Sequence, residues 1–393
     1  MILLVIFSGW PVQAMDTEKN PAIKRELDAG EDPLDKQQKE QVAKQDDEAP
    51  SDYSLYASIR GRYRQIIGDR SVWEDNGSRL GVNGWYEIVA KTWLFGRYEL
   101  GLNLLQELGL DSEYTQPDQN IGHTLFTRLA YVGVQKEENI VVIGKNWSTY
   151  YQVAGFTDRF DSSGGEASGA FNGASDGGDS GTGRADQVLQ TRLNLDLFKI
   201  RKGFKPLAIN MQIQRGQPIP GLDNHDYNYG FGASTIVELW NNVSIGIAYN
   251  YSAIDLQKIP AAERNGLNGS MSALLLGSQW IAEDWYLAAT LSRSTNLQMT
   301  NTQQYFEGTG IELYGQYQLF SNIWLLGGYN YLAPDSDQQQ TGDYLLSYAL
   351  FGVRYTIQDF TRMIYLESRL DQGRTTDNHN LGNQIIVGLR WSF

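Results

Sequence analysis

Hydrophobic and polar residues alternate with a period of two along most of the chain after Tyr53. In the segment 207–214, leucine, isoleucine and methionine take every second position, and alanine, asparagine and glutamine take the positions between them. Segment 244–250 alternates in the same way. Such alternation predicts β-strands with one apolar and one polar face, and it recurs in about sixteen segments, each of roughly ten residues. We therefore predict an all-β chain.

The connections between these segments alternate between short and long. The short ones are turns of about two to four residues, such as those at 137–138 and 282–284. The long ones are polar and lie at 68–78, 107–122, 217–226, 257–266, 334–343 and 371–380. Short turns at one rim and long loops at the other are typical of an outer-membrane β-barrel. An even number of antiparallel strands also closes the sheet without an exposed edge.

Two further observations favour a membrane barrel over a soluble β-sandwich, in which the same alternation would pack one sheet on another. No run of about 18 or more apolar residues follows the N-terminal stretch, so the sequence predicts no transmembrane helix. A sheet in lipid must then close into a barrel to satisfy its backbone. Several tryptophans lie at predicted strand ends, where interfacial girdles form. They are Trp240, Trp280, Trp285, Trp324 and Trp391.

One segment, about 148–184, breaks the alternation. A connection of about 35 residues without periodicity is uncommon in a compact strand array and is usually functional or disordered. We predict that this segment, the third of the long loops, folds into the barrel and narrows its channel. Its part 173–183 is rich in Gly, Ser and Asp, and Asp176 and Asp179 raise the alternative of a Ca²⁺ site. The spaced acids and the bidentate Glu of a calcium loop are missing, which favours a flexible acidic tip.

Composition excludes several classes of function. The chain of 393 residues contains no Cys, which rules out disulfides, thiolate metal sites and Cys nucleophiles. Its formal net charge of −14 argues against nucleic acid as a partner. The acid excess favours cations in a channel only weakly, because distant charges are screened over about 8–10 Å. We expect no cofactor and no metal.

The N-terminal region differs from the rest of the chain. Residues 1–14 are apolar and end in small residues, which predicts a secretory signal peptide; the alternative is a buried N-terminal strand. Residues 15–52 are rich in Asp, Glu, Lys and Gln and predict a periplasmic extension, disordered or partly helical. A cell-wall contact or a coiled trimer stalk are further alternatives for this extension. The barrel is predicted to occupy 53–393.

Several motifs together resemble the general porins of Gram-negative outer membranes. They are TRLAYVGVQ at 127–135, IGKNWSTYY at 143–151, GFTDRFDSSGG at 155–165, RLGVNGWYEI at 79–88 and IIVGLRWSF at 385–393. The resemblance covers roughly 53–393. The chain departs from the family in Lys145, where an Arg is usual, in RFDSSGG, where many members have a Pro-Glu-Phe-Gly-Gly turn, and in the Gly/Ser/Asp insert of the loop.

The resemblance implies a non-specific diffusion channel for ions and small polar solutes, with loop acids facing wall arginines. The matching wall positions are Arg79, Arg128 and Arg184, and the matching loop positions are Asp158 and Asp161. Arg60, Arg62 and Arg64 extend the basic strip, and Glu166 is a further loop acid. Parity supports the wall positions, because Leu80 and Val82 oppose Arg79, Leu129 and Tyr131 oppose Arg128, and Leu189 and Leu193 oppose Arg184 and Arg192. An Arg facing lipid at mid-bilayer costs about 2–4 kcal/mol.

The same family implies partners as well. They are the outer-membrane lipid and lipopolysaccharide, a homotrimeric assembly, and the barrel-assembly machinery, which would read the C-terminal segment ending in Phe393.

Three alternatives remain open. The first is an outer-membrane enzyme, but His123, His225 and His379 all lie in predicted loops without a defensible Ser/His/Asp arrangement. The second is a substrate-specific channel. Arg60, Arg62 and Arg64 would suit phosphate or another anion, whereas Tyr56 and Trp85 alone make no continuous aromatic path for a sugar. The third is a structural or adhesive barrel with a closed lumen.

Overall fold

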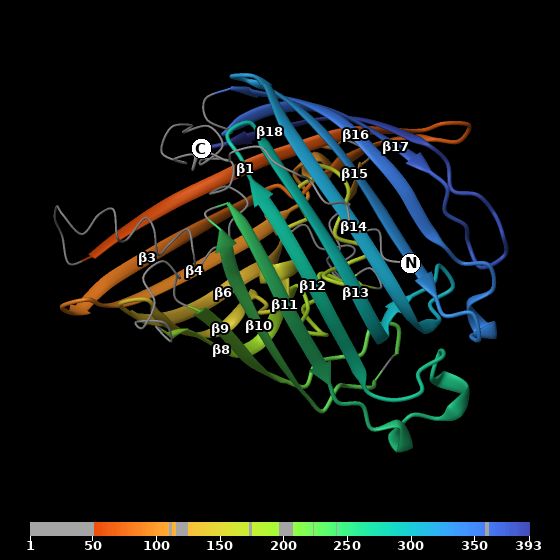
Figure 1. The fold of residues 1–393 in the computed structure, drawn as a ribbon, viewed down its shortest axis with the longest axis horizontal. Coiled ribbons are helices and arrows are strands. Elements are labelled where there is room, and N and C mark those ends of the chain that lie inside the picture. Colours follow the sequence, from red (N-terminus) through yellow and green to blue (C-terminus); the bar gives the residue numbers. More distant parts are fainter. Residues whose placement is uncertain are drawn as a thin grey trace.

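The computed structural model describes residues 51–109, 112–114, 125–172, 175–195, 207–222, 224–240, 242–357 and 361–393. These residues form one antiparallel sheet that closes on itself, with tilted strands side by side around a central axis (Figure 1). None of the helices in this part of the chain is long and apolar enough to cross a membrane. The predicted signal peptide and nearly all of the predicted extension lie outside the described residues.

The strands follow one another around the sheet in chain order. Their bounds are β1 Ser51–Ile66, β2 Ser71–Asp75, β3 Arg79–Val89, β4 Thr92–Leu102, β5 Ser112–Tyr114, β6 Leu125–Lys136, β7 Asn139–Trp147, β8 Arg184–Leu195, β9 Leu207–Arg215, β10 Tyr229–Trp240, β11 Val243–Ser252, β12 Met271–Ile281, β13 Trp285–Met299, β14 Tyr305–Phe320, β15 Ile323–Pro334, β16 Leu346–Ile357, β17 Arg362–Asp371 and β18 Gln384–Ser392. The barrel begins at Ser51, two residues before the predicted start.

The first and last strands close the barrel. β1 pairs antiparallel with β18 from Ser58 opposite Ser392 to Ile66 opposite Gln384. The backbones of Ala57 and Phe393 exchange two hydrogen bonds of 2.8 and 3.0 Å at the end of this seam. Closure removes the two open edges that a flat sheet would expose to lipid.

The predicted loop at 68–78 is wrong, because most of it is strand. Ser71–Asp75 pairs with Gln65–Gly61 of β1, and Arg79 onward pairs with Ser58–Ser51. β2 and β3 are thus two parts of one barrel strand, interrupted at Asn76–Ser78, where the Asp75 carboxylate accepts hydrogen bonds from the amides of Gly77 and Ser78. β5 is a three-residue strand parallel to β2. The predicted number of sixteen barrel strands is confirmed.

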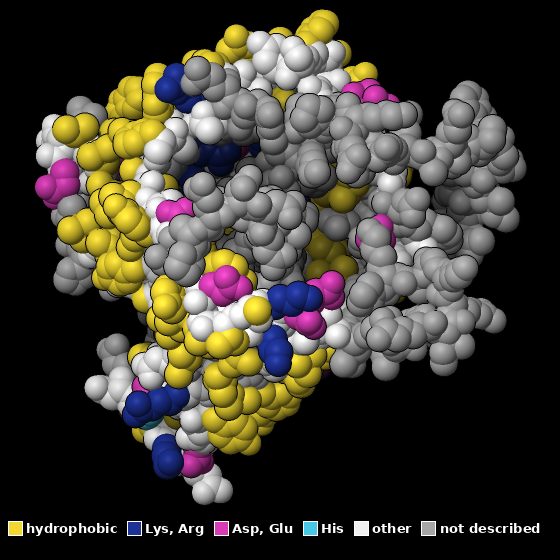
Figure 2. Space-filling view, turned by 90° about the vertical axis from the view of Figure 1, so that its left-hand side faces the viewer, with side chains coloured by type: hydrophobic (Ala, Val, Ile, Leu, Met, Phe, Trp, Pro, Cys, Tyr) yellow, Lys and Arg dark blue, Asp and Glu magenta, His cyan; other side chains and the backbone are white. Residues whose placement is uncertain are grey.

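The alternation of faces is confirmed along most strands. Leu55 is 74% exposed on the outer face, and Met211, Ile213, Ile245 and Ile247 are exposed as predicted. In a view onto one end of the barrel, hydrophobic side chains form the outer flank and charged side chains gather on the end that faces the viewer (Figure 2). The apolar outside is the surface that lipid solvates.

Two predictions about faces are wrong. Leu129 and Tyr131 were expected on the lipid face, but Leu129 is only 2% exposed, and both pack inside the barrel with Phe95 and Ile140. The register of β6 shifts between Glu99 and Leu100 of β4, so the bulged Arg128 does not reverse the face of its neighbour. Trp324, expected in an interfacial girdle, is fully buried against Met363, Tyr365 and Ile386. Trp280, Trp285 and Trp391 are exposed as predicted.

The asymmetry of the two rims is also visible. Short turns join β3 to β4, β6 to β7, β12 to β13 and β14 to β15, whereas long loops follow β4, β9, β11, β15 and β17 (Figure 1). These loops hold the short helices α3 Leu104–Glu107, η2 Leu256–Lys258, η3 Ala261–Glu263 and η4 Gln339–Thr341. The turns predicted at 200–203 and 358–360 lie outside the described residues.

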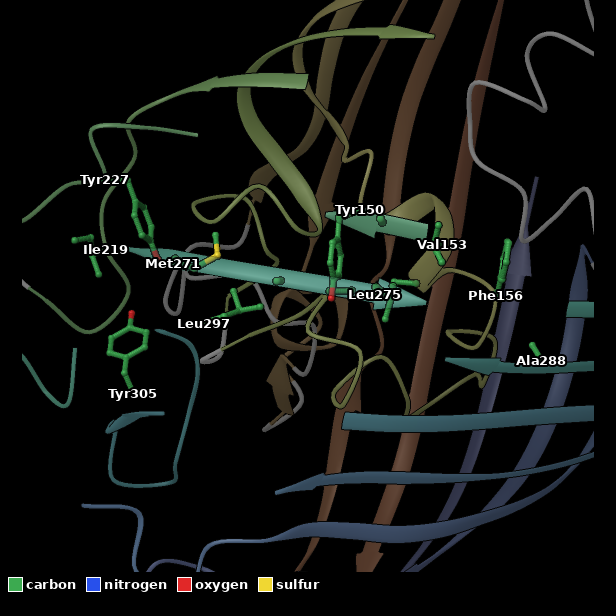
Figure 3. Close-up of a cluster of buried hydrophobic side chains, with 14 of the residues drawn as sticks. Tyr150, Val153, Phe156, Ile219, Tyr227, Met271, Leu275, Ala288, Leu297 and Tyr305 are labelled. Atoms are coloured by element: carbon green, nitrogen blue, oxygen red, sulfur yellow. The ribbon is translucent and has the colours of Figure 1, made fainter. Parts of the chain in front are cut away.

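The largest hydrophobic cluster joins the long segment after β7 to the barrel wall and to the outer loops. In the segment, Tyr150, Val153 and Phe156 belong to it, around helix α4 Tyr151–Ala154. Figure 3 shows Tyr150 and Val153 beside Leu275 of β12, with Tyr227 and Tyr305 at the far end of the cluster. The Tyr305 hydroxyl donates to the carbonyl of Pro220 at 2.6 Å, which ties two outer loops together. The segment therefore has an apolar anchor inside the barrel.

Candidate channel constriction

The segment between β7 and β8, residues 148–183, is called the constriction loop below. It runs along the inner wall from β10 to β17, where several glycines face it. A Cβ at Gly246 or Gly277 would lie 2.8 or 2.6 Å from a Val153 methyl, and a Cβ at Gly310 would lie 1.9 Å from the carbonyl oxygen of Ala167. Only a missing side chain lets the loop approach the wall so closely.

A buried wall carboxylate, Glu312 of β14, holds the middle of the loop. It accepts hydrogen bonds from the amides of Ala167 and Ser168 at 2.8 and 2.9 Å. It also accepts one from the hydroxyl of Thr157 at 2.6 Å. One side chain thereby fixes both the outgoing and the returning legs of the loop, and its charge is balanced by backbone donors.

A second wall carboxylate, Glu367 of β17, holds the far end. It accepts hydrogen bonds from the amides of Asp161 and Ser162 at 2.9 and 3.2 Å and from the Ser162 hydroxyl. The Asp161 carboxylate forms an ion pair of 2.7 Å with Arg354 of β16. Arg62 of β1 donates to the carbonyl of Ser162 at 2.5 Å. The loop therefore reaches from the end of β7 to strands β16, β17 and β1.

The returning leg is ordered, so the predicted flexible acidic tip is wrong. Residues 175–183 are all buried. Wall amides bind the loop carbonyls here, with Gln214 donating to Gly178 at 2.6 Å, Asn250 to Ser180 at 2.6 Å and Gln212 to Gly181 at 2.8 Å. Residues 173–174 lie outside the described part. These amide side chains replace the water that would otherwise solvate a polar, Gly-rich segment.

The acids of this leg are paired with cations of the strands beside it. Asp176 lies 3.1 Å from both Lys145 and Arg184, and Lys145 also lies 3.0 Å from Asp186. Burial, together with the nearby carboxylates of Asp176 and Asp186, raises the pKa of Asp179 to about 7. Among the described residues, no group of three or more His, Asp or Glu is arranged to hold a metal ion.

Five arginines line the wall that the loop leaves uncovered. They are Arg60, Arg79, Arg97, Arg128 and Arg390, called the arginine arc below, on strands β1, β3, β4, β6 and β18. Glu99, whose side chain is 2% exposed, lies between three of them, at 2.9 Å from Arg97, 3.0 Å from Arg128 and 3.8 Å from Arg79. The Tyr56 hydroxyl donates to Glu99 at 2.7 Å and accepts from Arg97 at 2.8 Å.

The structure brings together only some of the predicted site residues. Arg79 and Arg128 share Glu99, and Arg60 lies on the neighbouring strand in the arc. Arg62 and Arg64 instead contact Glu74 of β2, with Arg62 at 2.5 Å. Arg184 lies apart from the arc, over the ring of Trp147 and beside Asp176.

The loop acids have different surroundings. Asp158 accepts a hydrogen bond of 2.7 Å from the Tyr151 hydroxyl, and burial raises the pKa of this carboxyl. Asp161 pairs with Arg354, and Glu166 lies 3.3 Å from Arg369. Sequence reasoning missed Glu99, Glu312, Glu367 and Arg354. The available signal was a single charged residue at an inward-facing position within an otherwise apolar-alternating strand.

A closed sixteen-stranded barrel with a loop folded against its inner wall is the architecture of outer-membrane porins, whose lumen is an aqueous channel. No protein-family model matches the chain. Outer membrane porin protein OmpD of Citrobacter koseri is 25% identical over 358 residues, which are 86% of this chain and 91% of that protein. Outer membrane porin F of Xenorhabdus nematophila is 26% identical over 286 residues, 69% of this chain and 71% of that protein.

Solved structures share the fold. OmpF of Salmonella typhi, in a complex with daunomycin, superposes with a TM-score of 0.69 at 19% identity and covers 88% of this chain and 98% of its own. The trimer form of OmpT of Vibrio cholerae superposes with a TM-score of 0.61 at 14% identity and covers 88% of this chain. The chain is a porin of the general type. It is a multi-pass β-barrel of the outer membrane and functions as a diffusion channel.

Proposed function

We propose that the constriction loop sets the narrowest part of the channel, and that ions and small hydrophilic solutes pass between this loop and the arginine arc. The observation that carries the proposal is the double attachment of the loop's far end, through Ser162, to Arg62 of β1 and Glu367 of β17. A loop fixed at both ends of its path cannot swing out of the lumen without breaking these bonds. It therefore narrows the channel permanently.

Charge on the two sides of the gap would orient solutes. Asp158, Asp161 and Glu166 lie on the loop, whereas Arg60, Arg79 and Arg128 lie on the uncovered wall. Opposed charges across a narrow aqueous gap create a transverse field that favours polar solutes over apolar ones, because an apolar solute must displace oriented water. Arg62, Arg64 and Arg184 act mainly as ion-pair partners beside this gap.

The absence of Cys offers a clean test of the constriction. Ser163 is half-buried at the far end of the loop. In the Ser163→Cys variant, a bulky thiol reagent is expected to remove most of the current through single channels in a planar bilayer. The matched control is Thr302→Cys, in the exposed turn between β13 and β14, where labelling should leave the conductance unchanged. Full conductance of the labelled Ser163→Cys protein would exclude the loop as the constriction.

A passive channel is favoured over an outer-membrane enzyme. His225 pairs with Glu263 at 3.3 Å and His379 with Asp377 at 2.8 Å, both in outer loops. A hydrolytic site needs a nucleophile beside the base, and neither ring nitrogen is bonded to a hydroxyl in the described part of the chain. His123 lies outside that part.

Assembly and partners follow from the porin architecture. We propose a homotrimer, as found for the trimer form of the Vibrio cholerae protein, with lipopolysaccharide around its outer face. Phe393, 66% exposed beside the seam, would be the residue that the barrel-assembly machinery reads. Residues 1–14 as a signal peptide and 15–52 as a periplasmic extension remain proposals from sequence.

A further inference from the structure

We propose that the arginine arc is a binding subsite for a small oxyanion such as inorganic phosphate, which makes the channel favour anions despite the net acidity of the chain. The inference rests on the proposed function, because solutes must pass beside the arc. It assigns a substrate class to this wall of the channel.

The arc is built at the seam of the barrel, where the first and last strands meet. Arg60 of β1 and Arg390 of β18 are direct cross-strand partners. On the other side of β1, Ser58, two residues from Arg60, pairs with Arg79 of β3. Side chains at i and i+2 of a strand lie on the same face, so these guanidinium groups project into the lumen together. Like charges on adjacent strands repel and are retained only at a cost.

The acid inside the arc is already occupied. Glu99 accepts from Arg97, Arg128 and Tyr56 at 3.0 Å or less, so its lone pairs are largely used. One carboxylate among five arginines leaves an excess of four positive charges in this group. Arg60 donates from Nε to the Ser58 hydroxyl at 3.0 Å, and no ion pair joins it to an acid of the described residues. A mobile anion would offset this excess.

The position of the arc places it next to the constriction. Arg62, two residues from Arg60 on β1, contacts the carbonyl of Ser162 at the loop's far end. An anion at the arc would therefore lie in the path of solutes rather than in a side pocket. Guanidinium groups present planar forks that match the oxygens of phosphate, and the bond to a charged oxygen is stronger than a neutral hydrogen bond. Cations would meet like charge at the same point.

The test uses the purified full chain in a planar bilayer. The reversal potential in a KCl gradient measures the anion-to-cation permeability ratio, and inorganic phosphate is then added as a blocker of the chloride current. Wild type is expected to favour chloride and to show saturable block by phosphate. In Arg60→Gln/Arg390→Gln, the permeability ratio should fall about four-fold in dilute salt, about two-fold for each charge. The change should shrink at 1 M salt, where screening is strong.

Two further variants separate charge from geometry. Arg60→Lys/Arg390→Lys keeps the charge and loses the fork, so it should retain the permeability ratio and weaken the phosphate block about ten-fold or less. Lys258→Gln removes a charge from the exposed η2 segment and should change neither quantity. A neutral sugar that still permeates each variant shows that the barrel has folded.

The outcomes are distinct from those of the loop test. A wild-type channel that favours potassium, or a phosphate effect equal in wild type and Arg60→Gln/Arg390→Gln, would overturn the subsite while the channel itself stands. Phosphate block that depends on the arc in a channel whose Ser163→Cys variant is not blocked would keep the subsite and refute the constriction.

Discussion

The two halves of the inner wall use the same strand pattern for opposite purposes. The covered half, from β10 to β17, presents glycines and two buried carboxylates, Glu312 and Glu367, and all of these contact the constriction loop. The uncovered half, from β18 through β1 to β6, presents arginines around Glu99. The covered half holds a piece of the chain, and the uncovered half leaves its charge facing the lumen.

This difference shows what decides the role of an inward-facing residue. A carboxylate under the loop is satisfied by backbone amides, which carry no net charge, so it acts as an attachment point. A carboxylate in the arc is satisfied by three arginines and holds them in place. In both halves the apolar outside is the same, because lipid imposes the same demand on every strand.

Removing Glu99 should break the uncovered half most severely. Glu99→Ala takes the shared acid from three guanidinium groups in a buried site. Breaking a buried pair by removing one partner typically costs about 3–5 kcal/mol. We expect a loss of this size in the free energy of unfolding, measured by urea titration of the refolded barrel in detergent. Unchanged stability would show that the three arginines do not depend on Glu99.

Filling a glycine should break the covered half next. In Gly310→Ala the new methyl would overlap the carbonyl of Ala167, so either the wall or the loop must move. Overpacking costs about 1–3 kcal/mol. The variant should unfold at lower urea and show noisier single-channel currents. Gly327→Ala on β15 is the control, since its nearest neighbour would be 3.9 Å away. Equal behaviour of the two variants would argue against close docking of the loop.

The smallest effect is expected at an exposed ion pair that belongs to neither half. Arg293 and Asp335 lie 2.5 Å apart at the long-loop rim, with side chains more than a third exposed. Arg293 lowers the pKa of Asp335. Exposed pairs contribute about 0–1 kcal/mol. Asp335→Asn should therefore change neither unfolding nor the reversal potential measurably, and a large change would mean that rim charges control the pore.

The sequence predicted the barrel because alternation, turn length and closure are local properties. Leu55, Met211 and Ile247 face outward as their parity indicates. It also predicted that 148–184 would enter the barrel, since a long aperiodic loop has few other places in such a fold. The errors came where the local rule was interrupted, at the bulge of Arg128 and at the buried Trp324.

What the sequence by itself determined is the wall: which side chains meet lipid, where strands end, and that arginines such as Arg79 and Arg128 face water. Only the tertiary structure decided which charges meet. Asp161 pairs with Arg354, far along the chain, and Arg60 stands opposite Arg390 only because the sheet closes. Ion pairing acts over a few ångströms, and the register of a closed sheet, rather than spacing in the sequence, sets those distances.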